Sequence, residues 1–451
     1  MRKSKLSFLA IPLLITGCGD SLVSLTGYTA SMTCSKSFET DLNWQNIYDE
    51  DLNPITNGNV DLANVTIDTI NKSVTSKAFT VSKTSVYRPG LGCTLLSDNY
   101  DVLQQPYPNR EVTRGDGIEW PVGNKTSQSQ SANYEKLNKL ATAHFTEFKP
   151  YQVKSSSLAI VHDGNLIFEK YADNYTLDTP IYGFSIAKTV GTLFTGVLSD
   201  QGLLDINEPL NKPEWQGDAR KDITIKNLLN MTSGLDFSET YDDPVSDANM
   251  LFVADDMAEF SSNQPLANTP GSAFNYSTGD SLIVAGEIKR ILGGNLESSL
   301  INLNHNLLDK IGLNNSVVQA DSSGTLVFGM QGLFSTHDLA RLGQLLLQNG
   351  KWQGEQVVST QWMDFMKTPV NLQNSLGYTY GAGIWLNKKV NGRQFLPSLP
   401  EDTMIAFGLR GQFVIACPSL NLVMVRTGST LDAYDFIADM DDLSAGVIEA
   451  L

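Results

Sequence analysis

Hydrophobic and polar residues follow two kinds of pattern along the chain, one typical of helices and one typical of strands. In residues 137–144, LNKLATAH, apolar residues recur at helical spacing, which predicts a helix. Residues 155–172 read SSSLAIVHDGNLIFEKYA, in which two partly β-branched apolar runs flank Asp163-Gly164. An Asp-Gly pair between two such runs is a strong signal of a β-hairpin.

The middle of the chain, residues 184–370, is mostly helical in pattern, as in DSLIVAGEIKRIL and THDLARLGQLLLQNG. Strand patterns return towards the C-terminus in YGAGIWLNKKV, DTMIAFGL, GQFVIACP and NLVMVRTG, and a final helix is expected in DAYDFIADMDDLSAGVIEAL. Two strands before the helices and at least three after them predict one antiparallel sheet built from both chain ends. We therefore expect an α+β fold of two layers, with the helical region inserted between the halves of the sheet.

The N-terminal residues predict export. MRKSKLSFLAIPLLITGC combines basic residues with an apolar run of about twelve residues, which is too short to span a bilayer. We interpret residues 1–17 as a secretory signal peptide. The segment ending at Cys18 resembles the lipobox of bacterial prolipoproteins, so we expect Cys18 to be lipidated. Gly19 in place of aspartate favours the outer membrane, facing the periplasm; the alternative is a soluble secreted protein.

Composition divides the rest of the chain into three parts. Residues 18–105 are rich in Asn, Ser, Thr and Asp with short strand-like runs, and we expect an N-terminal appendage there. Residues 106–133 carry prolines, glycines and polar residues without periodicity, which indicates a connector. Residues 134–451 form the predicted main domain.

The chain is acidic, with 32 Lys and Arg against 49 Asp and Glu, a formal net charge of −17. Such a charge repels nucleic acid and anionic lipid, so we expect no nucleic-acid partner and no membrane contact beyond the lipid anchor. Of the three cysteines after Cys18, Cys417 lies in an apolar run typical of a buried thiol. In an oxidising compartment the other two, Cys34 and Cys93, are predicted to form a disulfide.

Ser185 and Lys188 lie three residues apart near the start of an apolar helix predicted from about Phe184 to Ser199. Residues three apart share a helix face, so the lysine is within reach of the hydroxyl. A serine becomes a nucleophile when a neighbouring base takes its proton, and a buried lysine with a lowered pKa is such a base. The plain alternative is that Ser185 supports the helix start and Lys188 extends to solvent.

Tyr276 follows a Pro270-Gly271 turn and precedes an amphipathic helix in FNYSTGDS. A phenol at such a place is able to enter a cleft and relay a proton. The plain alternative is a structural tyrosine beside a turn.

Three segments then carry a family resemblance: FSIAK, NYSTGD and AFGLRGQFVIACP. In this order they resemble the active-site elements of serine β-lactamases and penicillin-binding proteins. The chain resembles most closely the β-lactamase-related serine hydrolases typified by aminohexanoate-dimer hydrolases and related carboxylesterases. The resemblance runs from about residue 84 to 430 and implies the two-layer fold of those enzymes.

The resemblance implies roles for individual residues. Ser185 is the expected nucleophile, Lys188 its base and Tyr276 the general acid and base, without metal or organic cofactor. The backbone N–H groups of Ser185 and Gln412 are expected to form the oxyanion hole. By the same likeness, substrate contacts are expected from Tyr182, Tyr241 and Trp385.

Two positions depart from the family pattern. Leu409 stands where β-lactamases have lysine and many relatives histidine, and Arg410 follows it. Arg410 either supplies the missing positive charge to a substrate carboxylate or points away from the site. Thr278 stands where β-lactamases carry asparagine. Both departures favour a small-molecule ester or simple amide over a penicillin-like substrate.

Two other functions stay open. A catalytically impaired binding module with this fold is one, because the usual basic residue is missing at Leu409. The other is an α/β-hydrolase with a Ser-Asp-His triad, for which His305 and His337 lie downstream of Ser185. Neither the substrate nor the oligomeric state follows from the sequence.

Overall fold

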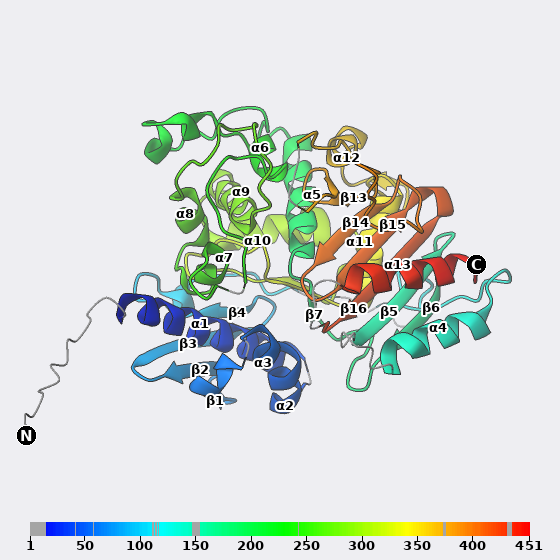
Figure 1. The fold of residues 1–451 in the computed structure, drawn as a ribbon, viewed down its shortest axis with the longest axis horizontal. Coiled ribbons are helices and arrows are strands. Elements are labelled where there is room, and N and C mark those ends of the chain that lie inside the picture. The colour runs from blue at the N-terminus through cyan, green and yellow to red at the C-terminus, as the bar shows by residue number, and fades with distance from the viewer. Residues whose placement is uncertain are drawn as a thin grey trace, which may run out of the picture.

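The computed structural model of the protein describes residues 15–40, 42–56, 58–110, 112, 115, 117–146, 154–241, 243–372, 376–430 and 435–451. Residues 1–14 of the predicted signal peptide lie outside the described residues, as do residues 111, 113, 114 and 116 of the predicted connector. Figure 1 shows a large sheet with its helices beside a helical region, and an N-terminal part that lies against both.

The main sheet has seven strands in the order β12-β13-β14-β15-β16-β5-β6, and each neighbouring pair is antiparallel. Two of its strands come from the start of the domain and five from its end, which confirms the sheet predicted from both chain ends. The strands are β5 (Ser155–His162), β6 (Asn165–Tyr171), β12 (Thr379–Tyr380), β13 (Trp385–Leu386), β14 (Met404–Gly408), β15 (Gln412–Cys417) and β16 (Leu422–Gly428).

The hairpin between β5 and β6 forms at the predicted turn. Asp163 has a φ of 49° and Gly164 a φ of 76°. Two successive positive φ values are the requirement of a type I′ turn, whose twist matches that of the paired strands. The Asp-Gly signal therefore predicted the place of the hairpin, and the structure adds the geometry of its turn.

Helices cover both faces of the main sheet (Figure 1). Leu158 and Ile160 of β5 face a core shared with α4 (Tyr134–Thr146) and α13 (Asp435–Ile448). The alternate residues Ala159 and Val161 face the core of the opposite side, which holds α5 and α11. Those two helices are α5 (Ile186–Asp200) and α11 (Thr336–Leu347). The alternation of side chains along the strand thus divides the apolar residues between the cores on the two faces of the sheet.

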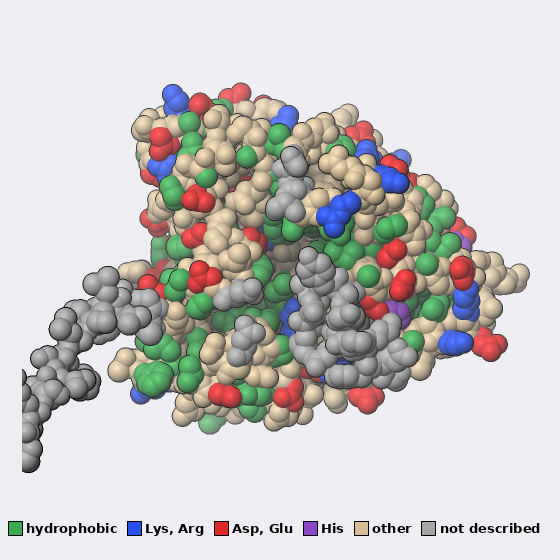
Figure 2. All heavy atoms as spheres, viewed as in Figure 1, with side chains coloured by type: hydrophobic (Ala, Val, Ile, Leu, Met, Phe, Trp, Pro, Cys, Tyr) green, Lys and Arg blue, Asp and Glu red, His purple; other side chains and the backbone are tan. Residues whose placement is uncertain are grey.

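The inserted helical region carries most of the remaining short helices and a three-stranded sheet, β7-β9-β8. Figure 2 shows the surface hollowed where this region meets the main sheet. The elements of the insertion and of the loops after it are α6 (Ile225–Leu229), α7 (Asp247–Met250), α8 (Met257–Ser262), α9 (Thr278–Ile291), α10 (Leu296–Leu303), α12 (Thr360–Met366), β7 (Ile181–Tyr182), β8 (Ser316–Val318), β9 (Gly332–Phe334), β10 (Lys351–Trp352) and β11 (Glu355–Gln356).

The N-terminal part differs from the sequence-based expectation, because a long helix crosses it. Within residues 18–105 only short strands were expected, yet α1 packs on a four-stranded sheet, β1-β2-β3-β4. The predicted disulfide between Cys34 of α1 and Cys93 of β4 is confirmed, with the two Cα atoms 6.0 Å apart. The elements are α1 (Ile15–Glu39), α2 (Trp44–Ile47), α3 (Asn53–Ile55), β1 (Asn64–Asp68), β2 (Ser73–Ala78), β3 (Val81–Arg88) and β4 (Gly92–Leu95).

Across the described ranges, no helix combines the length and the apolar content that crossing a membrane requires.

Candidate active site

Ser185 lies at the junction between β7 and α5. Phe184, one residue earlier, has a φ of 47°, in the left-handed region that costs a residue with a β-carbon about 1–2 kcal/mol. Every residue of α5 from Ile186 to Leu198 is buried, so the helix is held firmly on all sides. A strained turn therefore presents Ser185 from the end of a rigid helix.

Lys188 lies one turn along α5 and is only 2% exposed. Its Nζ lies 3.0 Å from Ser185 Oγ, 2.9 Å from Thr278 Oγ1 and 2.7 Å from the carbonyl oxygen of Gly329. Burial lowers the pKa of Lys188 to about 8, against an opposing effect of the Glu239 carboxylate. The predicted shared helix face thus brings the two functional atoms within hydrogen-bond distance, and the lysine does not extend to solvent.

Tyr276 lies in the loop before α9, and its phenol lies close enough to the Ser185 side chain for that side chain to lower the phenol pKa. Its ring stacks on Trp385 with 5.4 Å between centroids, and meets Tyr380 edge-on. Lys188 Nζ lies 5.0 Å from the Tyr276 ring centroid. Burial, together with the charge of Glu239, raises the pKa of Tyr276 well above its usual value, so the phenol is a proton donor at neutral pH.

Glu239 joins this cluster, and the sequence patterns did not point to it. The Thr278 backbone N–H donates to Glu239 Oε2 at 2.7 Å, and the Thr278 hydroxyl donates to Oε1 at 2.6 Å. The Tyr241 hydroxyl also donates to Oε1, at 2.8 Å. Glu239 lies in the loop between α6 and α7, 39 residues before Thr278. No local spacing could have signalled a contact over that separation.

The end of β14 lies against the turn that precedes Ser185. A β-carbon at Gly408 would come within 2.1 Å of the Gly183 carbonyl oxygen, so this approach requires glycine. Gln412 pairs with Gly408 in the sheet, which places the Gln412 backbone beside the same turn. The Gln412 side chain is bonded to both the N–H and the carbonyl of Gly428. Any contribution of Gln412 to chemistry therefore comes from its backbone N–H.

These groups open into a cavity of about 570 Å³. Tyr241 and Trp385, two of the predicted wall residues, line it, and Leu409 presents an apolar side chain there. Among the described residues that line it, Glu239 is the one with a formal charge. The lining consists of Ser185, Phe237, Ser238, Glu239, Thr240, Tyr241, Phe274, Asn275, Tyr276, Leu376, Trp385, Phe407 and Leu409.

Tyr182 lies elsewhere than expected, and Arg410 follows the second of its two alternatives, pointing away from the site. The Tyr182 hydroxyl is buried and donates to Ser35 Oγ at 2.8 Å, in a contact with α1. Arg410 is 5% exposed, and its Nη1 lies 3.1 Å from Asp51 Oδ1. Neither residue lines the cavity, because the N-terminal part covers this side of the domain and supplies polar partners for both.

The structure does not assemble the alternative triad. His337 Nε2 lies 2.6 Å from Glu169 Oε2, and Nδ1 lies 3.1 Å from Asn124 Oδ1. His305 lies in a helical turn, Asn304–Leu308, that follows α10. Among the described side chains, Lys188 is the ionisable group hydrogen-bonded to Ser185, and Tyr276 is the one whose pKa Ser185 affects. The antiparallel main sheet also differs from the mostly parallel sheet of α/β folds.

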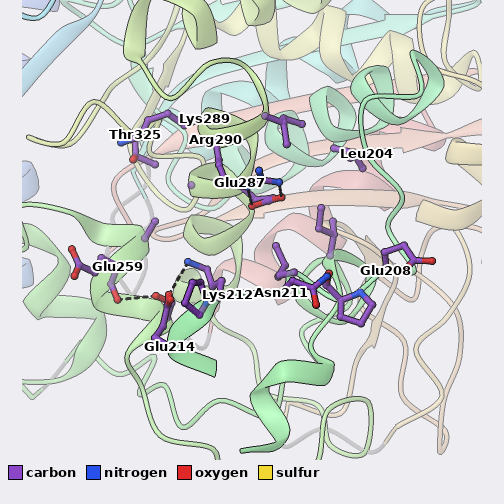
Figure 3. Close-up of a pocket in the computed structure, with 18 of the residues that line it drawn as sticks. Leu204, Glu208, Asn211, Lys212, Glu214, Glu259, Glu287, Lys289, Arg290 and Thr325 are labelled. Carbon is purple, nitrogen blue, oxygen red and sulfur yellow. Dashed lines mark hydrogen bonds and ion pairs between the residues drawn. The ribbon is translucent and has the colours of Figure 1, made fainter. Parts of the chain in front are cut away.

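A second cavity, of about 780 Å³, lies in the helical region (Figure 3) and shares no lining residue with the first. Several of its charged side chains pair with one another. Lys212 Nζ lies 3.3 Å from Glu214 Oε1, and Arg290 pairs with Glu287. Because neighbouring acids neutralise these cations, we place the candidate chemistry at Ser185.

Comparison with known proteins identifies the family that the sequence resembles. The sequence of residues 141–444 matches the Beta-lactamase family. The 6-aminohexanoate-dimer hydrolase of Paenarthrobacter ureafaciens is 24% identical over 225 residues. That match covers 47% of this chain and 56% of the relative, so the chain spans little more than half of the relative's length.

Solved structures resemble the fold over a larger share of the chain. A Bacillus anthracis protein named after 6-aminohexanoate-dimer hydrolase has a TM-score of 0.57 at 17% identity, covering 92% of this chain and 99% of that one. A family VIII carboxylesterase has a TM-score of 0.58 at 18% identity, covering 72% of this chain and 99% of the other. These similarities confirm the predicted β-lactamase-like and penicillin-binding-protein-like fold.

Proposed function

The chain belongs to the Beta-lactamase family, and from this premise we propose that it is a serine hydrolase that cleaves an uncharged ester or simple amide through an acyl-enzyme on Ser185. One observation carries the proposal: Lys188 Nζ, buried and with its pKa lowered to about 8, lies 3.0 Å from Ser185 Oγ. A pKa near 8 leaves roughly one lysine in ten neutral at pH 7, which supplies a base for the hydroxyl.

In the proposed acylation, Ser185 Oγ bonds to the substrate carbonyl carbon while its proton passes to Lys188 Nζ. The carbonyl oxygen takes up the negative charge and accepts from the backbone N–H groups of Ser185 and Gln412. As the bond to the leaving group breaks, the Tyr276 phenol gives its proton to that group and regains one from the Lys188 ammonium. Water then repeats the attack on the acyl-enzyme and restores Ser185.

The proposed substrate is uncharged at the reacting end. The charged group in the described cavity lining is the Glu239 carboxylate, which repels an anionic substrate. Arg410, the cation that could have received a substrate carboxylate, is paired with Asp51 instead. The aromatic side chains of Tyr241, Tyr276 and Trp385 provide apolar contact area for an acyl or alkyl group.

A fluorophosphonate probe tests the nucleophile. We expect covalent labelling of the purified protein, lost in Ser185→Ala and retained in Ser199→Ala, a matched serine at the far end of α5. Mass spectrometry of the labelled peptide identifies the modified residue. Folded protein that resists labelling would favour the binding module, the alternative left open by the loss of a basic residue at Leu409.

A substrate panel tests the class of bond. The panel consists of 4-nitrophenyl butyrate, the 4-nitrophenyl hemiester of glutarate, a 6-aminohexanoate dimer, D-alanyl peptides and nitrocefin. We expect turnover of the butyrate ester that depends on Ser185, with kcat/KM at least about tenfold above that of the anionic hemiester. Equal rates for both esters would contradict the proposed charge preference.

We also propose that the protein is a lipoprotein anchored through Cys18 to the outer membrane and facing the periplasm. The sequence around Cys18 supports this proposal. A chain that begins at Cys18 keeps all but the first three residues of α1, including Cys34. Incorporation of a labelled fatty acid, lost in Cys18→Ser, tests the anchor, and fractionation of the membranes tests the location.

A further inference from the structure

The contacts of Lys188 fix where its electron pair points when it is neutral. A neutral amine has two N–H donors and one electron pair. Three oxygens surround Nζ, those of Ser185, Thr278 and Gly329. The Gly329 carbonyl has no proton to give, so it always takes one of the two N–H groups.

The Thr278 hydroxyl decides the second contact. A hydroxyl has one proton, and this one is committed to Glu239 Oε1 at 2.6 Å. Thr278 Oγ1 is therefore an acceptor towards Lys188, at 2.9 Å. With both N–H groups engaged by Gly329 and Thr278, the electron pair is left facing Ser185 Oγ.

We propose that Glu239 is a positioning residue for acylation: it holds the Thr278 hydroxyl as an acceptor, so that the electron pair of neutral Lys188 points at Ser185. The inference rests on the proposed function and deepens it. Without the carboxylate, the Thr278 proton is free to turn towards Lys188 and bond to the electron pair that Ser185 needs. The amine would then be neutral but aimed at the wrong oxygen.

Glu239 also has a structural contact, since it accepts the backbone N–H of Thr278 in the first turn of α9. A test must therefore separate orientation from simple support of the helix. The groups that act on Lys188 come from different parts of the fold: Ser185 from the junction of β7 and α5, Tyr276 from the loop before α9, and Glu239 from the α6–α7 loop. Asp280 of α9 is a buried acid two residues after Thr278, and its Oδ1 accepts from the Ser233 hydroxyl.

The pH dependence of kcat/KM for 4-nitrophenyl butyrate separates the two roles. The Glu239 charge opposes deprotonation of Lys188, so Glu239→Gln should move the acid limb of the profile to lower pH. The plateau should nevertheless fall at least tenfold, because the glutamine amide has one accepting oxygen for the two Thr278 donors. With that oxygen on the Thr278 N–H, the amide NH2 faces the hydroxyl, whose proton then turns towards Lys188. A variant that only loosens the helix loses rate without the acidward shift.

Variants of Thr278 isolate the hydroxyl from the charge. Thr278→Val should lower the plateau at least tenfold without the acidward shift, and Thr278→Ser, which keeps the hydroxyl, should restore most of the rate. Glu208→Gln is the matched charge control, because Glu208 is an exposed acid that lines the second cavity (Figure 3). It should leave both the limb and the plateau unchanged.

Each outcome decides the matter. A Glu239→Gln enzyme with the wild-type plateau, or with a lowered plateau but an unmoved limb, overturns the positioning role. So does an equal shift in Glu208→Gln. Absence of Ser185-dependent turnover in the wild-type protein would instead defeat the proposed function, which the fluorophosphonate experiment registers separately.

Discussion

At the scale of single residues, the protonation of Lys188 sets the pH dependence of the proposed reaction. Burial lowers the pKa of this amine to about 8, and the base is the neutral form. We therefore expect kcat/KM for a neutral ester to rise with pH and level off above an apparent pKa near 8. Initial rates with 4-nitrophenyl butyrate between pH 6 and 9.5, corrected for spontaneous hydrolysis, measure this limb.

Asp280 requires a control, because burial also raises the pKa of its carboxyl to about 8. If the limb belongs to Lys188, Asp280→Asn keeps it, since asparagine does not titrate. A profile that is flat through this range in the wild-type enzyme would exclude Lys188 as the base. Loss of the limb in Asp280→Asn would assign it to the carboxyl.

Tyr276→Phe tests the proton donor. The phenol is needed to protonate a poor leaving group, whereas 4-nitrophenoxide leaves without help. For an ethyl ester or amide we expect kcat to fall by about 100-fold or more, and for the nitrophenyl ester by much less. Acylation rates for the two leaving groups, compared in both enzymes, measure the difference. An equal loss for both would mean that Tyr276 shapes the cavity rather than delivering a proton.

The buried Asp280 carboxyl should also make the free energy of unfolding depend on pH. Its raised pKa means that the folded state prefers the protonated carboxyl, which is uncharged and therefore costs less to bury. The stability linked to this group is fully present below its unfolded pKa, near 4, and is lost as the pH rises through about 8. Asp280→Asn imitates the protonated form, so the drop in unfolding free energy from pH 5 to pH 8 should shrink by at least about 1 kcal/mol. Urea unfolding at the two pH values measures it, and an unchanged drop would contradict the assignment.

At the scale of elements, the disulfide fastens α1 to its sheet. Cys34 and Cys93 are separated by 59 residues, and closing a loop of this length restricts the unfolded chain. We expect Cys34→Ala/Cys93→Ala to lower the free energy of unfolding by about 4 kcal/mol. Urea unfolding followed by tryptophan fluorescence measures the loss.

Cys417→Ala is the matched control, because Cys417 is a buried cysteine with a free thiol. It should cost no more than the repacking of one small side chain, about 1 kcal/mol. Thiol titration of the denatured, unreduced protein that starts at a lipidated Cys18 should find one free thiol. A double variant as stable as the wild type would show that the disulfide leaves the unfolded state unrestricted.

Elements that local sequence stabilises could be predicted, whereas elements that tertiary packing stabilises could not. The hairpin at Asp163-Gly164 was predictable because local turn chemistry fixes it. Helix α1 was not, because its sequence is rich in Ser, Thr and Gly and its stability comes from packing on β2, β3 and β4.

The candidate site divides in the same way. Ser185 and Lys188 lie one helical turn apart, so spacing alone brought them together. Glu239 contacts Thr278 only because the tertiary fold brings them together. Arg410 points away from the cavity because it pairs with Asp51, which is far from it in the sequence. Contacts of that kind leave no periodic signal in a sequence.

At the scale of the whole molecule, one carboxylate ties the N-terminal part to the edge of the active site. Asp51 is 3% exposed and accepts from Arg410 Nη1 at 3.1 Å, while Lys36 Nζ lies 3.3 Å from its other oxygen. Arg410 belongs to the turn between β14 and β15, directly after Leu409 of the cavity wall. The N-terminal part therefore restrains a turn that shapes the proposed substrate site.

This arrangement predicts unequal costs for breaking the cluster from its two sides. Asp51→Asn leaves two buried cations, Lys36 and Arg410, without a counter-ion, and should lower the unfolding free energy by about 3–5 kcal/mol. Arg410→Met leaves the pair of Asp51 with Lys36 intact and fills the same space with an apolar side chain, so its cost should be smaller. The double variant should be more stable than Asp51→Asn alone, because one unpaired cation has been removed. Urea unfolding of the three variants, set against the wild type, gives the order.

The same variants bear on substrate choice. If Arg410 serves the fold and not the substrate, Arg410→Met should keep the wild-type ratio of kcat/KM for 4-nitrophenyl butyrate to that for the glutarate hemiester. If Arg410 instead binds a substrate carboxylate, the variant should lose activity on the hemiester selectively. An Asp51→Asn protein no less stable than Arg410→Met would show that Asp51 is not the common counter-ion. The N-terminal part would then cover the domain without governing the turn at Leu409.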